Sequence, residues 1–182
     1  MLITTERLVL RRFRAGDAET LAAYRSAPEV AVYQSWRAPY PLERARYAIE
    51  TMAAADPEQP GWFQYAIELK DGREHIGDVG VNLNDNLMQA EIGYTLAPRR
   101  QGHGYATEAV RAVLDHLFRV RGLHKVSAEC DARNVASARV LERLGFTREG
   151  LLRRHTWTKD EWTDDLIYGL LRTEYLGPAA AS

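Results

Sequence analysis

A nine-residue stretch with two closely spaced glycines carries the clearest chemical signal in the chain. It reads Arg-Arg-Gln-Gly-His-Gly-Tyr-Ala-Thr and spans residues 99–107. Gly102 and Gly104 lack a Cβ, so backbone N–H groups can turn toward a ligand there. A helix is predicted to begin directly afterwards, and its first N–H groups have no partners within the helix and attract anions. The stretch therefore predicts a pyrophosphate site, with the positive charges of Arg99 and Arg100 beside it.

Two other kinds of phosphate-binding loop fit these residues less well. A dinucleotide-binding loop has a third glycine or an alanine where this chain has Thr107, and it follows its strand directly. Here residues 98–101 separate the predicted strand from Gly102, although Glu129 and Asp131 lie near the distance expected for a ribose-binding acid. A Walker-type loop needs Gly-Lys followed by Ser or Thr, which the chain lacks. We therefore expect neither.

Hydrophobic periodicity predicts the elements that must hold this loop in place. Apolar residues alternate over 63–69, 79–83 and 90–96, which is typical of an antiparallel meander. The strongest helical pattern follows the loop, over 106–118. Strands are further predicted at 8–14, 126–130, 146–157 and 165–171. Helices are predicted at 17–26, where Asp17 can act as the cap, at 41–52 and after Asn134. The prediction is an α/β domain with a mixed, mostly antiparallel sheet of about seven strands, flanked by about four helices.

Composition narrows the class of protein. The 182 residues include 24 Lys and Arg against 25 Asp and Glu, a balance that argues against nucleic-acid binding as the main role. The longest run without a charged residue, 59–67, is far shorter than the ~20 residues of a membrane span, and no signal-peptide core is present. A single cysteine, Cys130, excludes an internal disulfide and a multi-cysteine metal site. We expect a cytoplasmic protein with one domain over 1–176, a tail over 177–182, and no metal, nucleic-acid or membrane partner.

Several short motifs together resemble a known family. The spacing of Arg99, Gly102 and Gly104 is similar to the acetyl-CoA pyrophosphate loop of the GNAT N-acetyltransferase superfamily. The narrower resemblance is to ribosomal-protein N-terminal acetyltransferases, and it rests on four motifs: Thr-Glu-Arg-Leu at 5–8, Glu-Ile-Gly-Tyr at 91–94, Asn-Val-Ala-Ser at 134–137 and Leu-Gly-Phe-Thr at 144–147. One departure is the turn near 159–161, which often carries a glycine in this group and here reads Lys-Asp-Glu.

The resemblance implies direct attack of an amine on the thioester of bound acetyl-CoA, and it suggests a role for each residue. Cofactor binding falls to Leu96, Asn134 and the loop, which comprises Arg99, Gln101, Gly102, His103, Gly104, Tyr105, Ala106 and Thr107. The backbone N–H of Leu96 would polarise the carbonyl, Asn134 would contact the pantetheine arm, and Ser137 would protonate or hydrogen-bond the leaving sulfur. Glu91 is the first candidate for the base, with Glu129 and Asp131 as second choices.

Aromatic and acidic side chains outside the loop suggest where the amine binds. Tyr33 and Trp36 lie in an irregular stretch over 28–40, and Trp157 and Asp164 belong to a turn that carries four acids. Aromatic faces and carboxylates suit a cationic amine. We expect a peptide or protein N-terminal amine as the acceptor. A small amine such as an aminoglycoside is the alternative, and a non-catalytic acyl-CoA-binding sensor is a further one. The resemblance also suggests a homodimer.

Overall fold

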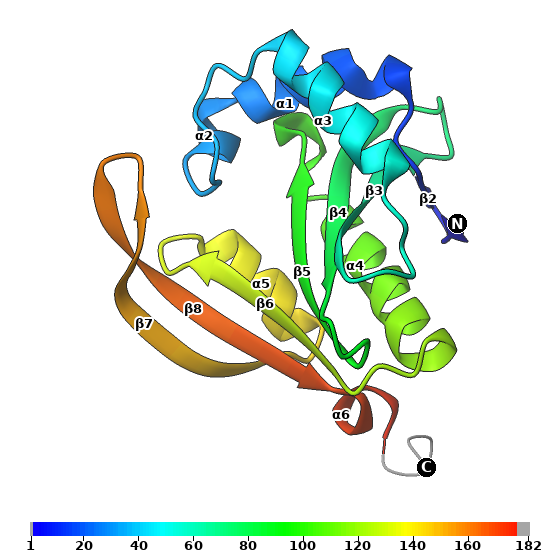
Figure 1. Cartoon of the computed structure of the whole chain (residues 1–182), viewed down its shortest axis with the longest axis vertical. Coiled ribbons are helices and arrows are strands. Elements are labelled where there is room, and N and C mark those ends of the chain that lie inside the picture. The colour runs from blue at the N-terminus through cyan, green and yellow to red at the C-terminus, as the bar shows by residue number, and fades with distance from the viewer. Residues whose placement is uncertain (1, 178–182) are drawn as a thin grey trace.

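The computed structural model describes residues 2–177, which form a mixed sheet with helices on both faces (Figure 1). The predicted tail therefore lies, from residue 178 on, outside the described residues. In chain order the elements are β1 (Ile3–Thr4), β2 (Leu8–Arg11), α1 (Ala18–Ser26), α2 (Pro28–Ala31), α3 (Leu42–Ala54), β3 (Gly61–Leu69), β4 (His75–Leu83), β5 (Gln89–Leu96), α4 (Tyr105–Asp115), β6 (Lys125–Asp131), α5 (Val135–Arg143), β7 (Thr147–Thr158), β8 (Glu161–Leu171) and α6 (Arg172–Leu176).

The eight strands of the described chain lie in the order β1-β2-β3-β4-β5-β6-β8-β7, and only β5 and β6 are parallel neighbours. This confirms the predicted fold class. The prediction of about seven strands was one short, because the two-residue β1 also pairs with β2. The short helices α2 and α6 were not predicted. Pro28 starts α2, a single turn within the segment expected to be irregular.

The start of α1 differs from its prediction. Asp17 was expected to cap this helix, but its carboxylate instead accepts two hydrogen bonds of 2.8 Å from the Arg11 guanidinium and one of 2.7 Å from Arg14 N. A bidentate pair with arginine is stronger than a neutral cap, so the carboxylate turns toward β2. The strand predicted over 8–14 ends early, at Arg11. Arg11 is the residue whose guanidinium binds Asp17.

The two faces of the sheet bury different helices. Phe63, Tyr65 and Ile67 of β3 point into one hydrophobic core together with α4 and α5, while Ala66 points into the other with α1 and α3. This is the alternation expected of a strand that is covered on both faces. The same rule places Ile92 of β5 on the α4 face and Glu91 on the opposite face. No helix within residues 2–177 is long and apolar enough to cross a membrane.

The sheet opens between β5 and β6. The two strands pair only from Gln89–Ile92 to Lys125–Ala128. Beyond that point β5 stays with β4 as far as Leu96, and β6 stays with β8 as far as Asp131. Figure 1 shows the two strands starting together and spreading apart toward α2 and α5. A gap therefore forms between the ends of β5 and β6, in the middle of an otherwise continuous sheet.

Candidate active site

A cavity of about 540 Å³ occupies this gap. Both strand ends line it, the glycine-rich loop and the start of α4 close one side, and α5 lies next to them. The other side is formed by residues of α2 and the turn after it. The cavity therefore reaches from the α4 face of the sheet to the α2 side, with the strand ends in between.

The glycine-rich loop has the geometry expected of an anion site. Gly102 and Gly104 have φ angles of +77° and +80°, a region that side chains rarely adopt. Gly104 is the N-cap of α4, and the first helical bond runs from Glu108 N to Gly104 O at 3.0 Å. The N–H groups of residues 104–107 therefore have no helical partner, and all four residues line the cavity. Together with the helix dipole they form a positive wall.

The charged side chains of the loop lie outside the cavity lining. Arg100 forms an ion pair with Glu74, so its charge is already balanced. Arg99 is exposed, and His103 bonds the carbonyl of Gln101 at 2.7 Å; neither lines the cavity. The arginines that do line it are Arg139 and Arg143 of α5, which the sequence reasoning missed. Their spacing of four residues, which places both on one helix face, was the available signal.

The backbone of Leu96 faces the gap. Ala97 N donates to Ile76 O at 2.8 Å, so the odd-numbered residues at the end of β5 bond to β4. The N–H of Leu96 then points the other way, toward the side that β6 has left. Its carbonyl, which belongs to the following peptide with Ala97 N–H, accepts a hydrogen bond of 3.1 Å from Gln101 Nε2, so the loop is anchored to the end of β5. The geometry thus provides a donor where the sequence predicted one.

Ser137 and Tyr94 form a hydroxyl pair on the cavity wall. Their oxygens lie 2.9 Å apart, and Tyr94 also donates to the Ser137 carbonyl at 3.0 Å. Burial raises the pKa of Tyr94 well above its ordinary value, which keeps the phenol protonated. Asn134 also lines the cavity; it caps α5 by accepting a bond of 3.1 Å from Ser137 N. In the sequence, Tyr94 stands out only as part of the Glu-Ile-Gly-Tyr motif at 91–94.

Cys130 lies beside the same pair. Burial raises the pKa of its thiol to about 11, and a hydrogen bond from Ser137 opposes this shift. The cysteine is therefore a neutral part of the wall at ordinary pH, rather than a reactive thiolate. Among the described residues, no group of three or more His, Cys, Asp or Glu side chains could hold a metal ion.

Two glutamates sit on the face of the sheet opposite Ile92 and Ala128, Glu129 near the end of β6 and Glu91 in the part of β5 that still pairs with β6. Glu129 lines the cavity, whereas Glu91 lies on that face of β5 without lining it. Burial raises the pKa of Glu91. Burial, followed by the charges of Asp165 and Glu91, raises the pKa of Glu129, and His155 opposes that shift. Asp131, the other second choice, is held by Arg133, whose hydrogen bonds lower the pKa of Asp131 against the effect of burial.

The four predicted acceptor residues do not lie together. Tyr33 lines the cavity next to Glu29 and Gln34, which sequence reasoning missed. Trp36 is only 9% exposed and belongs to the core under α1, where its ring NH donates to Arg25 O at 3.0 Å. A large aromatic residue in an irregular stretch can lie in the hydrophobic core or at the edge of a binding site, and composition does not distinguish these two positions. Trp157 is exposed at the β7–β8 hairpin, packed edge-on against Trp162.

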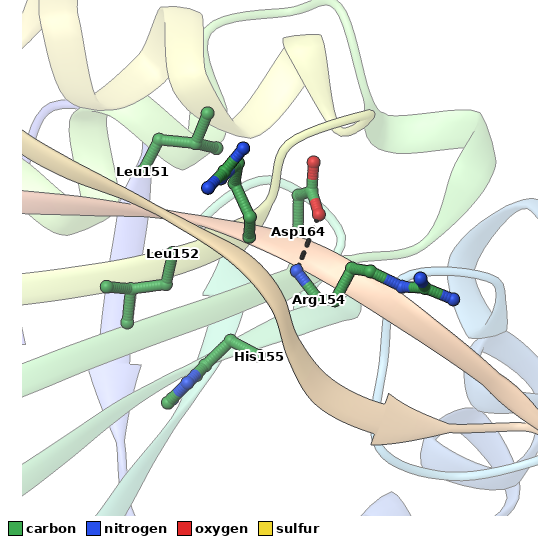
Figure 2. A pocket seen from close by; sticks show the side chains of 6 residues that line it. Leu151, Leu152, Arg154, His155 and Asp164 are labelled. Carbon is green, nitrogen blue, oxygen red and sulfur yellow. Dashed lines mark hydrogen bonds between the residues drawn. The ribbon is translucent and has the colours of Figure 1, made fainter.

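Asp164 belongs to a different depression, on the outer strand β7. Here the pairing with β8 shifts between Leu152 and Thr156, and Arg154 N donates to Asp164 Oδ1 at 2.7 Å. Figure 2 shows this bond and shows Leu152 and His155 pointing away from Asp164. The depression is wide and shallow, and its lining of residues 151–155 and 164 includes neither the glycine loop nor a helix start. We therefore place the candidate active site in the cavity between β5 and β6.

Hydrogen bonds and an ion pair join the β7–β8 hairpin to the α2 side of this cavity. Lys159, at the tip of the β7–β8 hairpin, donates to the carbonyls of Ala31 (2.6 Å) and Val32 (3.2 Å), and also to that of Gln34. Asp160 pairs with Arg37 at 2.8 Å. Figure 1 shows the hairpin tip opposite α2. The hairpin is therefore tied across the cleft to the segment that contributes Tyr33.

Comparisons with known proteins agree with this geometry. Residues 7–147 match the acetyltransferase (GNAT) domain family. The chain is 34% identical over 174 residues to an uncharacterized N-acetyltransferase, p20, of Bacillus licheniformis, which covers 95% of this chain and 97% of that protein. It is 26% identical over 180 residues to the [ribosomal protein uS5]-alanine N-acetyltransferase of Escherichia coli, covering 95% and 92%. A GNAT-family acetyltransferase structure from Bacillus anthracis superposes with a TM-score of 0.88 at 28% identity, covering 96% and 100%.

The family predicted from the motifs is thereby confirmed. The matched region contains the glycine loop, both strand ends and α5. The chain belongs to the GNAT family and is an acetyl-CoA-dependent N-acetyltransferase.

Proposed function

We propose that the enzyme acetylates a cationic primary amine, with the N-terminal amine of a peptide or protein as the first acceptor class. The observation that carries this proposal is the charge difference along the cavity. The loop, the start of α4 and Arg139 and Arg143 make the cofactor end positive, while Glu29 and Glu129 make the other end negative. An anionic cofactor and a cationic amine would thus enter opposite ends and meet at the strand ends.

In this proposal the cofactor is held by backbone groups and attacked at the gap. The N–H groups of the loop and of α4 bind the pyrophosphate, and Asn134 contacts the pantetheine arm. The N–H of Leu96 stabilises the oxyanion that develops on the acetyl carbonyl. As the C–N bond forms and the C–S bond breaks, the Ser137 hydroxyl donates a hydrogen bond to the leaving thiolate, which departs as an anion, and Tyr94 hydrogen-bonds the Ser137 oxygen.

Before it attacks, the acceptor ammonium loses a proton to Glu91 or Glu129, and the neutral amine is the nucleophile. Both groups have raised pKa values, which makes them stronger bases than an ordinary glutamate. An α-amine, with a pKa of ~8, needs less help than a lysine with a pKa of ~10.4. A half-buried glutamate at this position is therefore better matched to an N-terminal amine than to a lysine side chain.

Two observations bear on the size of the acceptor. The hydrogen bonds of Lys159 and the ion pair of Asp160 hold the hairpin close to the segment after α2. This arrangement favours a slender acceptor such as a peptide N-terminus over a folded protein surface. A relative at 26% identity is named for acetylation of a ribosomal-protein alanine. The acidic wall also favours small amines with several positive charges, and these form the second candidate class.

The test is a product assay with two acceptor panels and acetyl-CoA. One panel holds peptides with free N-terminal Ala, Ser or Met, each with an N-terminally blocked control. The other holds polyamines and aminoglycosides. Acceptor-dependent thiol release, with one acetyl group found by mass spectrometry on the free N-terminus, supports the first class. Turnover restricted to the small amines replaces it with the second, and acetyl-CoA binding without turnover on either panel favours a sensor.

A further inference from the structure

The N-terminal Thr-Glu-Arg-Leu motif lies directly against the cofactor loop. Arg7 Nε and Nη2 both lie 2.6 Å from Glu108 Oε2, and Arg7 N donates to Glu108 Oε1 at 2.9 Å. Thr5 Oγ1 donates to the same Oε1 at 2.6 Å. Four contacts from a segment some hundred residues away therefore converge on one carboxylate in the first turn of α4.

Arg7 also reaches the loop itself. Its Nη1 donates to the carbonyl of His103 at 3.1 Å, and its guanidinium carbon lies 4.5 Å from the centre of the Tyr105 ring. A Cβ placed on Gly104 would lie 3.5 Å from Arg7 Nη2. The His103 carbonyl belongs to the peptide whose N–H is that of Gly104. Fixing this oxygen therefore fixes the direction of one N–H group at the site.

Without Arg7, the negative charge of Glu108 would be unfavourable at a phosphate-binding helix start. A carboxylate in the first turn stabilises a free helix, but it repels the phosphates that the same turn is built to bind. The side chain of Glu108 is only 17% exposed, so water screens its charge poorly. A guanidinium with two hydrogen bonds to it removes most of that repulsion.

We propose that Arg7 is a positioning residue of the acetyl-CoA site, which presets the loop by holding the His103 carbonyl and neutralising Glu108. This rests on the proposed assignment of the loop to the cofactor pyrophosphate. The backbone of the segment is held independently, because Lys70 N donates to Arg7 O at 2.9 Å. Removal of the Arg7 side chain should therefore leave β2 in place and act on the loop.

The experiment measures CoA binding by calorimetry, and steady-state kinetics with whichever acceptor the panels identify. Arg7→Ala should raise the Kd of CoA and the KM of acetyl-CoA about tenfold, the loss expected for a charge-assisted pair. The kcat at saturating acetyl-CoA and the KM of the acceptor should stay within about twofold of wild type, because the chemistry lies elsewhere. Glu108→Gln added to Arg7→Ala should restore part of the affinity, since it removes the unbalanced charge.

Matched variants separate this role from others. Arg12→Ala, on the same segment, removes hydrogen bonds to the carbonyls of Ala53 (3.0 Å) and Ala55 (2.7 Å), away from the loop. It should lower the Tm but leave CoA binding unchanged, and an equal loss of CoA affinity in Arg12→Ala and Arg7→Ala would overturn the proposal. The loss in Arg7→Ala should also be the same for 3′-dephospho-CoA. If it disappears with that probe, Arg7 contacts the 3′-phosphate directly and does not act through the loop.

Gly104→Val distinguishes a failure of the loop assignment from a failure of the positioning role of Arg7. If it leaves CoA binding intact, the loop assignment fails, and the proposal for Arg7 fails with it. If it weakens binding while Arg7→Ala does not, the loop assignment stands and only the positioning role is wrong.

Discussion

The two ends of the cavity are built in different ways. The cofactor end consists of backbone N–H groups at a helix start, fixed by two glycines and one short loop. The other end, where we propose that the acceptor binds, consists of side chains from α2, β5 and β6, and hydrogen bonds from Lys159 to the carbonyls of Ala31 and Val32 join the β7–β8 hairpin to it. The backbone groups of the cofactor end lie within one short stretch of sequence, although Arg7 contacts that stretch from some hundred residues away. The other end has no such local core and depends on segments more than a hundred residues apart.

This difference fits the partners that the two ends serve. A pyrophosphate is the same in every acetyl-CoA, and backbone groups bind it whatever side chains surround them. An acceptor differs between enzymes, so its site is made of replaceable side chains and loops on a rigid scaffold. Variants at the cofactor end should therefore change acetyl-CoA binding alone, and variants at the acceptor end should change the acceptor or the chemistry.

The largest effect is expected from the two candidate bases, Glu91 and Glu129. Glu91→Gln and Glu129→Gln should each keep the Kd of CoA, and the variant that removes the base should lower kcat/KM by about 10²–10⁴-fold at pH 7. The loss should shrink at high pH, where the amine loses its proton without help. Burial raises the pKa of both groups, so the acid limb of the wild-type rate profile should lie above the ordinary glutamate value of 4.5. Wild-type rates in both variants at pH 7 would leave proton removal to water.

The next largest effect is expected at the loop. Gly104→Val places a β-branched residue at a φ of +80°, which strains the start of α4 and turns its N–H groups away from the ligand. The rise in Tm caused by acetyl-CoA should be mostly lost. Gly72→Val is the matched control, because Gly72 has a φ of +72° and open space in the turn between β3 and β4. It should lower the Tm of the free enzyme and leave the acetyl-CoA shift intact.

A smaller effect is expected at the hairpin tip. Lys159→Met removes the hydrogen bonds to the carbonyls of 31–34, so the segment that carries Tyr33 is held less firmly. The acceptor KM should rise severalfold, while the KM of acetyl-CoA stays unchanged. Lys125→Met is the control, since Lys125 pairs with Glu149 outside the cavity. A parallel rise in both KM values would mean that the tie supports the whole fold, and the contrast between the two ends would be lost.

The same contrast explains what the sequence could predict. The meander, the crossover helix and the glycine loop follow from periodicity and from glycines at positive φ, which are local properties. The roles of Lys159 and Arg7 arise from contacts across more than ninety residues, which no spacing rule reveals. Trp36 was expected at the acceptor site and lies in the core against Arg25, since a buried tryptophan and a binding tryptophan look alike in sequence.

The hairpin turn illustrates the same limit. Lys159 and Asp160 have φ angles of +49° and +69°, a conformation for which hairpins usually use Asn or Gly. The departure from the family pattern at 159–161 was visible in the sequence. The contacts that stabilise this turn were not visible in the sequence. Lys159 bonds the carbonyls of 31–34 and Asp160 pairs with Arg37 only in the folded chain.

The smallest effect concerns stability rather than rate. The folded-state pKa of Glu91 is raised by burial, so between its ordinary value of 4.5 and the raised value the folded chain binds more protons than the unfolded chain. Stability contributed by this group is therefore present at low pH and is lost as pH rises through that window. Glu91→Gln has no carboxyl group to ionise and so avoids this loss of stability at high pH. Its Tm should exceed that of wild type by about 1–2 °C at pH 7 and equal it near pH 4. The measurement is thermal unfolding of both proteins at the two pH values without ligand. A variant that is less stable at pH 7 would mean that the ionised carboxylate makes favourable contacts, and that Glu91 stabilises the strand end rather than serving the reaction.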